Sequence, residues 1–90
     1  MLTPVPTTRY LKDVKLALRR GKDIRKLEAA IVLLANRETL PTSLRDHSLS
    51  GDRQHHRECH VAPDWLLIYR IDEDELFLVR TGTHSDLFSR

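Results

Sequence analysis

The sequence contains little cysteine, glycine or aromatic residue. Its 90 residues include one cysteine, Cys59, and three glycines, and the aromatic fraction is 6%. A single cysteine excludes an intrachain disulfide framework and favours a reducing compartment, so we expect a cytoplasmic protein. The longest apolar run, residues 29–35, is far shorter than the ~20 residues of a membrane-spanning helix, so we expect no membrane partner. Met1 is followed by Pro4 and Pro6 rather than by a basic segment and an apolar run, which argues against a signal peptide.

The composition fits one small globular domain over residues 1–90. A hydrophobic fraction of 40% and a charged fraction of 31% are ordinary for a folded chain of this length. The net charge is only +2, yet residues 9–37 carry nine Lys and Arg against three Asp and Glu. Such a basic segment suits a phosphate-rich partner or an acidic protein. A solvated helix surface has the same composition, so charge alone does not decide between them.

The first half of the chain predicts two helices. One is expected from Thr8, because apolar residues recur every three or four positions from Leu11 to Leu18. Gly21 provides a helix stop, and Asp23 can cap a second helix with the same apolar periodicity. Because the link between them is short, the two helices should form an antiparallel hairpin.

The second half predicts an antiparallel meander. Its strands are expected at about Gln54 to Val61, Trp65 to Ile71 and Glu75 to Thr81. Ala62-Pro63-Asp64 forms the first tight turn, since Pro presets φ and Asp suits turn positions. Residues 72–74 form the second, acidic turn.

Three other segments complete the predicted fold. Residues 1–8 contain two prolines, so a strand there must be short or lie at an edge. Residues 42–53 are predicted to be a loop anchored by Leu44 and Leu49, and residues 85–88 one closing helical turn. The order (β)ααβββ predicts an α+β fold, with the helical hairpin packed on a small antiparallel sheet.

The meander is expected to gather the residues with chemical potential at one tip of the sheet. Alternate strand ends coincide in a meander, so His84 should return to the turn that carries His60 and Asp64. His47, in the preceding loop, is the fourth candidate, and Arg80 lies one residue before the end of the last strand. Histidines can accept and donate protons near neutral pH, which is what metal-free RNA cleavage requires.

RNA supplies its own nucleophile, the ribose 2′-hydroxyl, so the enzyme needs a base, an acid and positive charge. Arg80 is the candidate for the charge on the phosphorane. Trp65 and Phe88 are candidate surfaces for stacking bases, each contact being worth ~1–3 kcal/mol, although such rings are more often core residues. No metal or other cofactor is required by this chemistry.

A metal site is the rival chemistry. His55, His56, Cys59 and His60 offer imidazole and thiolate donors. Strand alternation separates His55 and Cys59 from the other two, and no spacing matches a zinc pattern, so we expect no metal. Cys59 as a nucleophile lacks a base fixed beside it, and a buried structural role is favoured.

Several motifs occur together in a specific order. The most specific are His60-Val-Ala-Pro-Asp-Trp65 and Arg80-Thr-Gly-Thr-His84. The motif-bearing segments are residues 12–16, 46–51, 57–61, 63–69, 80–85 and 87–88. Taken together, from about Tyr10 to Phe88, they resemble the YafQ branch of the RelE/ParE toxin superfamily.

The resemblance implies a toxin of a type II toxin–antitoxin pair with a microbial-ribonuclease-like α+β fold. It implies a ribosome-dependent endoribonuclease, or mRNA interferase, that a cognate antitoxin neutralises. The site implied by motif position comprises His47, His60, Asp64, Trp65, His84 and Phe88. The family assigns the general acid to His84; Asp64 is our first choice as base, with His47 and His60 steadying the phosphorane or sharing the base role.

The resemblance also gives the basic segment a partner, because relatives bind ribosomal RNA through Lys and Arg surfaces and an antitoxin segment covers the toxin. The residues expected to serve RNA or antitoxin binding are Lys12, Lys15, Arg19, Arg20, Lys22, Arg25 and Lys26. Two alternatives remain open: a gyrase-inhibiting toxin of the same fold without catalytic histidines, and a non-catalytic RNA-binding module. The family pattern has no match for His55 and His56, and Pro4 and Pro6 lie where it has a first strand.

Overall fold

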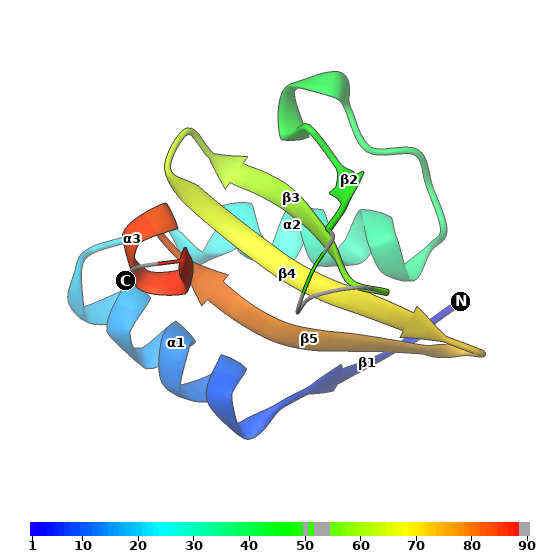
Figure 1. The fold of residues 1–90 in the computed structure, drawn as a ribbon, viewed down its shortest axis with the longest axis horizontal. Helices are drawn as coiled ribbons and strands as arrows, with labels where there is room; N and C mark the ends of the chain where they lie inside the picture. Colours follow the sequence, from blue (N-terminus) through cyan, green and yellow to red (C-terminus); the bar gives the residue numbers. More distant parts are fainter. Residues whose placement is uncertain (50, 52–54, 89–90) are drawn as a thin grey trace.

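A computed structural model describes residues 1–49, 51 and 55–88 of the chain. The elements, in order, are β1 (Thr3–Pro6), α1 (Thr8–Arg19), α2 (Ile24–Ala35), the short 3-10 helix η1 (Thr42–Leu44), β2 (His47–Ser48), β3 (Arg57–Ala62), β4 (Trp65–Asp72), β5 (Glu75–Gly82) and α3 (His84–Phe88) (Figure 1). The strands form one five-stranded sheet in the order β1-β5-β4-β3-β2. The predicted α+β fold, with two helices packed on a sheet, is confirmed.

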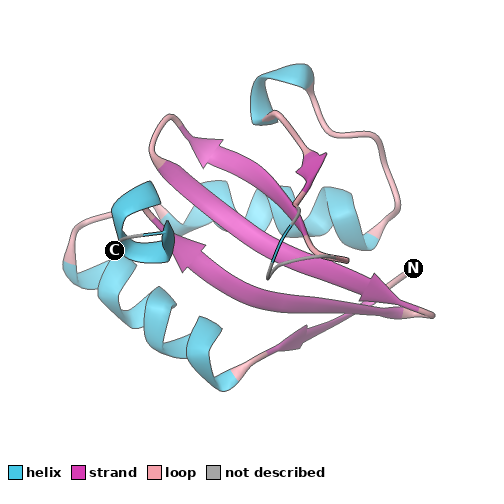
Figure 2. Cartoon of the chain, viewed as in Figure 1, coloured by secondary structure: helices cyan, strands magenta, loops and turns pink. Residues whose placement is uncertain are grey.

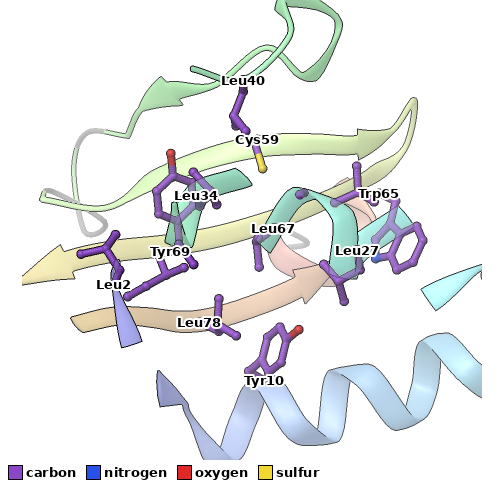
Figure 3. Close-up of a cluster of buried hydrophobic side chains, with 14 of the residues drawn as sticks. Leu2, Tyr10, Leu27, Leu34, Leu40, Cys59, Trp65, Leu67, Tyr69 and Leu78 are labelled. Atoms are coloured by element: carbon purple, nitrogen blue, oxygen red, sulfur yellow. The ribbon is translucent and has the colours of Figure 1, made fainter. Parts of the chain in front are cut away.

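The two long helices pack on one face of the sheet. In Figures 1 and 2, α2 crosses behind the sheet and α1 lies beside β5. Figure 3 shows Trp65 and Tyr69 of β4 in the same buried cluster as Leu27 and Leu34 of α2. Among the described residues, no helix is both long and apolar enough to cross a bilayer.

The predicted helix ends are confirmed, whereas the apolar stripe of α1 is only partly correct. Asp23 caps α2 by accepting from the backbone N–H of Arg25 at 3.1 Å, and Gly21 takes a left-handed φ of 77°. However, Leu11 and Leu18 are 50% and 57% exposed, because α1 turns a different face to the sheet. The buried residues of α1 are Tyr10, Asp13 and Ala17.

The N-terminal strand forms in spite of its prolines. β1 pairs in parallel with β5, so the sheet is not wholly antiparallel. The Thr3 N–H donates to the carbonyl of Asp74, in the turn before β5, at 2.8 Å, and the Thr7 N–H donates to the carbonyl of Leu78 in β5 at 3.0 Å. The alternation of the strand therefore points the N–H positions of Pro4 and Pro6 toward the open edge, where a missing donor costs nothing.

The loop predicted over residues 42–53 contains two elements, η1 and β2. β2 is two residues long and is defined only by its pairing with β3, so no local sequence pattern predicts it. Leu44 packs half-buried against the core as predicted, and Leu49 is also half-buried. β3 begins at Arg57 rather than near Gln54, which lies outside the described residues together with residues 50, 52, 53, 89 and 90.

β4 is the central strand, as its two apolar faces predicted. Every residue from Trp65 to Tyr69 is at most 2% exposed. Trp65, Leu67 and Tyr69 belong to the core beneath the helices. Leu66 and Ile68 alternate with them, so their side chains point to the opposite face of the sheet. There they lie beside their partners in β3, His60 and Glu58.

Candidate active site

Four rings lie in a row on the sheet face opposite α1 and α2. The ring centroids of His47 and His60 are 6.4 Å apart, those of His60 and His84 5.6 Å, and those of His84 and Phe88 6.5 Å. They come from β2, β3 and the two ends of α3. The structure thus brings together the three histidines that the meander was expected to gather, and their catalytic roles stay predictions.

Asp64 fixes the orientation of His84. One carboxylate oxygen, Oδ1, lies 2.7 Å from His84 Nδ1 and accepts from the His84 backbone N–H at 3.0 Å. A carboxylate only accepts, so Nδ1 is the nitrogen that carries the proton in this contact. The backbone N–H and then the ring of His84 lower the pKa of Asp64, which stays ionised. His84 is left with Nε2 to meet a substrate.

Glu58 is a site residue that the sequence analysis missed. Its side chain is 7% exposed and one oxygen, Oε2, lies 3.7 Å from His47 Nε2. It shares a strand face with His60 two residues later, and that spacing was the available signal. One atom from each of Glu58, His60 and His84 lies within 4.8 Å of the others, so this trio could hold a metal ion.

The candidate metal donors differ from the set that was weighed, and set aside, in the sequence analysis. Two imidazoles and a carboxylate suit Zn²⁺ or Cu²⁺ and would leave a coordination position open. Cys59 takes no part, because it lies on the core face of β3 and burial raises its pKa to about 12. A metal ion on His60 and His84 would occupy the nitrogens that proton transfer needs.

Trp65 does not offer a stacking surface. Its ring is 2% exposed, and Nε1–H donates to Thr81 Oγ1 at 2.9 Å in the core. Lys22 Nζ approaches the ring to 5.9 Å from its centroid. The expectation of a base stacking on Trp65 therefore gives way to a structural role, whereas Phe88 is 41% exposed at the end of the row.

Arg80 is paired with a buried carboxylate. Its Nε and Nη2 groups donate to the two oxygens of Asp13 at 2.7 and 3.1 Å. The same carboxylate accepts from the Thr81 backbone N–H at 3.1 Å, beyond the last residue of β5 that β1 covers. The positive charge expected to serve the phosphorane is thus largely neutralised by α1, and only Nη1 has no bond to Asp13.

The basic residues of the expected set fall into three groups. Arg20 lies 2.6 Å from Asp86, and Arg25 lies 3.0 Å from Asp23, so both make local ion pairs. Lys22 is half-buried beside Trp65. The remaining exposed cations of the expected set, which make no ion pair within the described part of the chain, are Lys12, Lys15, Arg19 and Lys26.

The short helix α3 carries His84 and Phe88 and is tied down by Asp86. The carboxylate accepts from the Thr83 backbone N–H at 3.0 Å, and the Asp86 backbone N–H donates to Thr83 Oγ1 at 3.1 Å. This reciprocal pair of hydrogen bonds makes Thr83 the N-cap of α3. A Cβ at position 82 would meet the Asp86 side chain at 3.0 Å, which explains the glycine there.

Asp86 is expected to make stability pH-dependent. The Arg20 guanidinium, followed by the Thr83 N–H, holds the pKa of the Asp86 carboxyl far below its ordinary value of 3.8. Because the unfolded carboxyl keeps the ordinary value, this stabilisation is complete above pH 3.8 and is lost as pH falls below it. In urea unfolding, the stability advantage of wild type over Asp86→Asn should therefore shrink from about pH 6 to about pH 3.

The matched control is Asp72→Asn, since the Asp72 side chain is 66% exposed. That variant should stay close to wild type at both pH values. An Asp86→Asn difference of the same size at both pH values would contradict the assignment.

The segment that carries His47 is anchored through Asp46. Its Oδ1 accepts from the Tyr69 hydroxyl at 2.5 Å and from Arg57 Nε at 3.2 Å. Burial, and then the Asp46 carboxylate, raise the pKa of Tyr69, so the phenol stays a neutral donor. Asp46 and His47 point to opposite faces of the sheet, so a bond on the core side fixes a ring on the site side.

Tyr69→Phe is expected to lower the free energy of unfolding by about 1.5–3 kcal/mol, the usual worth of a hydrogen bond to a charged group. Urea unfolding measures the loss, and the NMR signals of the His47 ring should broaden or shift. Tyr10→Phe is the control, because within the described residues no hydrogen bond of the Tyr10 hydroxyl is found. Equal losses in the two variants would argue against the anchor.

Known proteins are similar to this chain in sequence and in fold. A family model described as "Bacterial toxin of type II toxin-antitoxin system, YafQ" matches residues 2–89. The "mRNA interferase toxin YafQ" of Escherichia coli (strain K12) is 48% identical over 80 residues, covering 88% of this chain and 87% of that protein.

Solved structures agree with the sequence comparison. The E. coli DinJ-YafQ toxin-antitoxin complex contains a chain 43% identical, with a TM-score of 0.88 and 97% of each chain covered. The metal-bound toxin from Helicobacter pylori is 41% identical, with a TM-score of 0.92 over 98% of this chain and 100% of that one. This chain therefore belongs to the YafQ family of bacterial toxins from type II toxin–antitoxin systems.

Proposed function

We propose that this chain is an mRNA interferase, a toxin that cleaves messenger RNA on the translating ribosome and is neutralised by a cognate antitoxin. The name of the E. coli relative, mRNA interferase toxin YafQ, supports the activity. The observation that carries the proposal is the pair of imidazoles of His60 and His84, 5.6 Å apart, with Asp64 bound to one of them. Two such groups suit the two proton transfers of RNA cleavage.

The reaction needs no atom beyond those of RNA and the site. A base removes the proton of the ribose 2′-hydroxyl, and the 2′-oxygen attacks the adjacent phosphorus. The bond to the 5′-oxygen then breaks, and His84 Nε2–H donates its proton to that oxygen. The products are a 2′,3′-cyclic phosphate and a 5′-hydroxyl. Asp64 remains bonded to His84 Nδ1 and stabilises the charged form of the ring before it gives up its proton.

The base role fits His60 better than Asp64. Asp64 was the first choice from sequence, but its Oδ1 is committed to His84, and its lowered pKa makes it a weaker base. The ring of His60 lies next to that of His84, and Glu58 lies on the same face of β3 as His60. His47 then steadies the phosphorane from the next place in the row, with the free Nη1 of Arg80 as a minor source of charge.

The exposed cations suit the two macromolecular partners. The YafQ of E. coli was solved in a toxin–antitoxin complex with DinJ, which supports a cognate antitoxin here. α1 exposes Leu11 and Leu18 between Lys12, Lys15 and Arg19, a surface that suits an acidic, amphipathic antitoxin segment as well as ribosomal RNA. The cellular location that we propose for such a toxin is the cytoplasm.

The test is primer-extension mapping of a reporter messenger RNA in a translating extract, with a ribosome-free control. We expect cuts that require both wild-type toxin and ribosomes and that disappear on addition of the antitoxin. Cuts of equal strength without ribosomes would remove the ribosome dependence. Growth arrest without any cut would overturn the nuclease proposal in favour of a gyrase-inhibiting toxin.

A further inference from the structure

We propose that the cleft between the start of α2, η1 and the end of β3 is a subsite for one nucleotide of the RNA, next to the scissile phosphate. Figure 1 shows the elements that contribute its lining residues, namely α2, the green segment that contains η1, and β3. The proposal rests on the proposed function, because it names how the same site holds its substrate.

The cleft has the size and the walls of a small-ligand site. Its volume is about 490 Å³, within the ~300–1,000 Å³ range typical of ligand pockets. Leu44, Ala62 and Pro63 give it an apolar wall against which a base can lie. His60 also lines it, so the cleft and the ring row share this residue, which is the proposed base.

The rim of the cleft is cationic. Lys26 and Arg45 both line it, both are exposed, and neither makes an ion pair within the described part of the chain. Among the residues that the structure describes, no acidic side chain lines the cleft. Two unpaired cations at the mouth of an apolar cleft complement a base that carries a phosphate, rather than an uncharged ligand.

The backbone holds Arg45 in an unusual position. Its φ is 49°, a left-handed conformation that non-glycine residues adopt at a cost. The conformation is held on both sides: the Arg45 N–H donates to the Thr42 carbonyl at 3.0 Å, and the Arg45 carbonyl accepts from His47 Nδ1 at 2.7 Å. Arg45 therefore lines the cleft and also bonds His47 of the ring row, so the proposed nucleotide site is directly connected to the proposed catalytic residues.

The substrate favoured by these features is RNA rather than an antitoxin segment. A phosphate at the rim and a base on the apolar wall use every feature of the cleft, and the strand would continue directly to His60. The antitoxin is expected to be acidic and could also meet the two cations, so it forms one arm of the test.

The experiment is an NMR titration of ¹⁵N-labelled protein with adenosine 3′-monophosphate, with inorganic phosphate in parallel. We expect amide shifts at residues 43–45 and 61–62 with the nucleotide. Ala62→Phe, which fills the cleft, and Lys26→Ala with Arg45→Asn, which remove its charge, should each weaken binding by about tenfold or more. Asn is chosen because it tolerates the left-handed φ.

Val32→Phe and Arg9→Ala are the controls, since Val32 is 55% exposed, Arg9 is exposed and neither residue lines the cleft. Both should bind the nucleotide as wild type does. Shifts confined to His60 and His84, equal affinity for inorganic phosphate, or cleft variants that lose only antitoxin affinity would each overturn the subsite.

Failure of the subsite and failure of the proposed function give different results. Messenger-RNA cutting by wild type without nucleotide shifts in the cleft would remove the subsite alone. Nucleotide binding in the cleft, lost in Ala62→Phe, together with no cutting by wild type, would support the subsite and remove the nuclease.

Discussion

Replacement of His84 by alanine is expected to slow messenger-RNA cleavage by roughly 10²–10⁴, the usual contribution of a positioned acid or base. His84 is held by Asp64 through both its ring and its backbone N–H, so its Nε2 is presented in a fixed direction. Alanine removes the proton donor for the 5′-oxygen, whereas the exposed cations remain. Ribosome binding should therefore stay close to that of wild type.

The measurement is the single-turnover rate of cutting on purified ribosomes across a range of pH. The pH–rate profile of wild type should show the fall in rate that follows loss of the proton from the general acid. The profile of His84→Ala should lack this fall. Asp64→Asn should fall between the two, because it removes the carboxylate that orients the ring but leaves the ring in place. His55→Asn is the control, as His55 is outside the row and Asn tolerates its φ of 72°. Normal rates in His84→Ala would sink the assignment.

Replacement of Asp13 by alanine is expected to lower the free energy of unfolding by about 3–5 kcal/mol. The side chains of Asp13 and Arg80 are 9% and 13% exposed, so the change leaves a guanidinium buried without its counter-charge. The Thr81 backbone N–H loses its acceptor at the same time. Urea unfolding measures the loss, and Lys15→Ala, on the exposed side of the same helix, is the control.

A double variant separates stability from charge supply. Asp13→Leu with Arg80→Met replaces the buried pair by apolar side chains of similar size and should recover much of the lost stability. If Arg80 also serves the phosphorane, this stable variant still cuts more slowly than wild type. Full activity would show that Arg80 is structural alone, and a double variant no more stable than Asp13→Ala would contradict the pairing argument.

Local patterns sufficed for α1, α2, the three long strands and the gathering of His60, Asp64 and His84, because these depend on short-range features. The caps, the turn at Pro63 and the strand alternation fix where His60 and Asp64 point, and the meander returns His84 to them. Glu58 follows from the same alternation once His60 is taken as an inward residue of the site.

Local patterns could not predict the roles of three other aspartates, Asp13, Asp46 and Asp86. Asp13 bonds Arg80 across 67 positions, Asp86 bonds Arg20 across 66, and Asp46 bonds Tyr69 across 23. Each of these pairings depends on tertiary packing. The same limit explains β2, which exists only beside β3, and Trp65, whose burial depends on helices contributed by another part of the chain.

The pairing of β1 with β5 has a consequence for how the toxin emerges during its own synthesis. Thr7 Oγ1–H bonds the Val79 carbonyl across 72 positions, so the first strand has no mate until the last strand is made. Contacts of such sequence separation close late. His84 follows β5 in chain order, so a nascent chain still short of β5 has two helices but neither a closed sheet nor the proposed acid. The row of rings can therefore assemble only when synthesis of the chain is nearly complete.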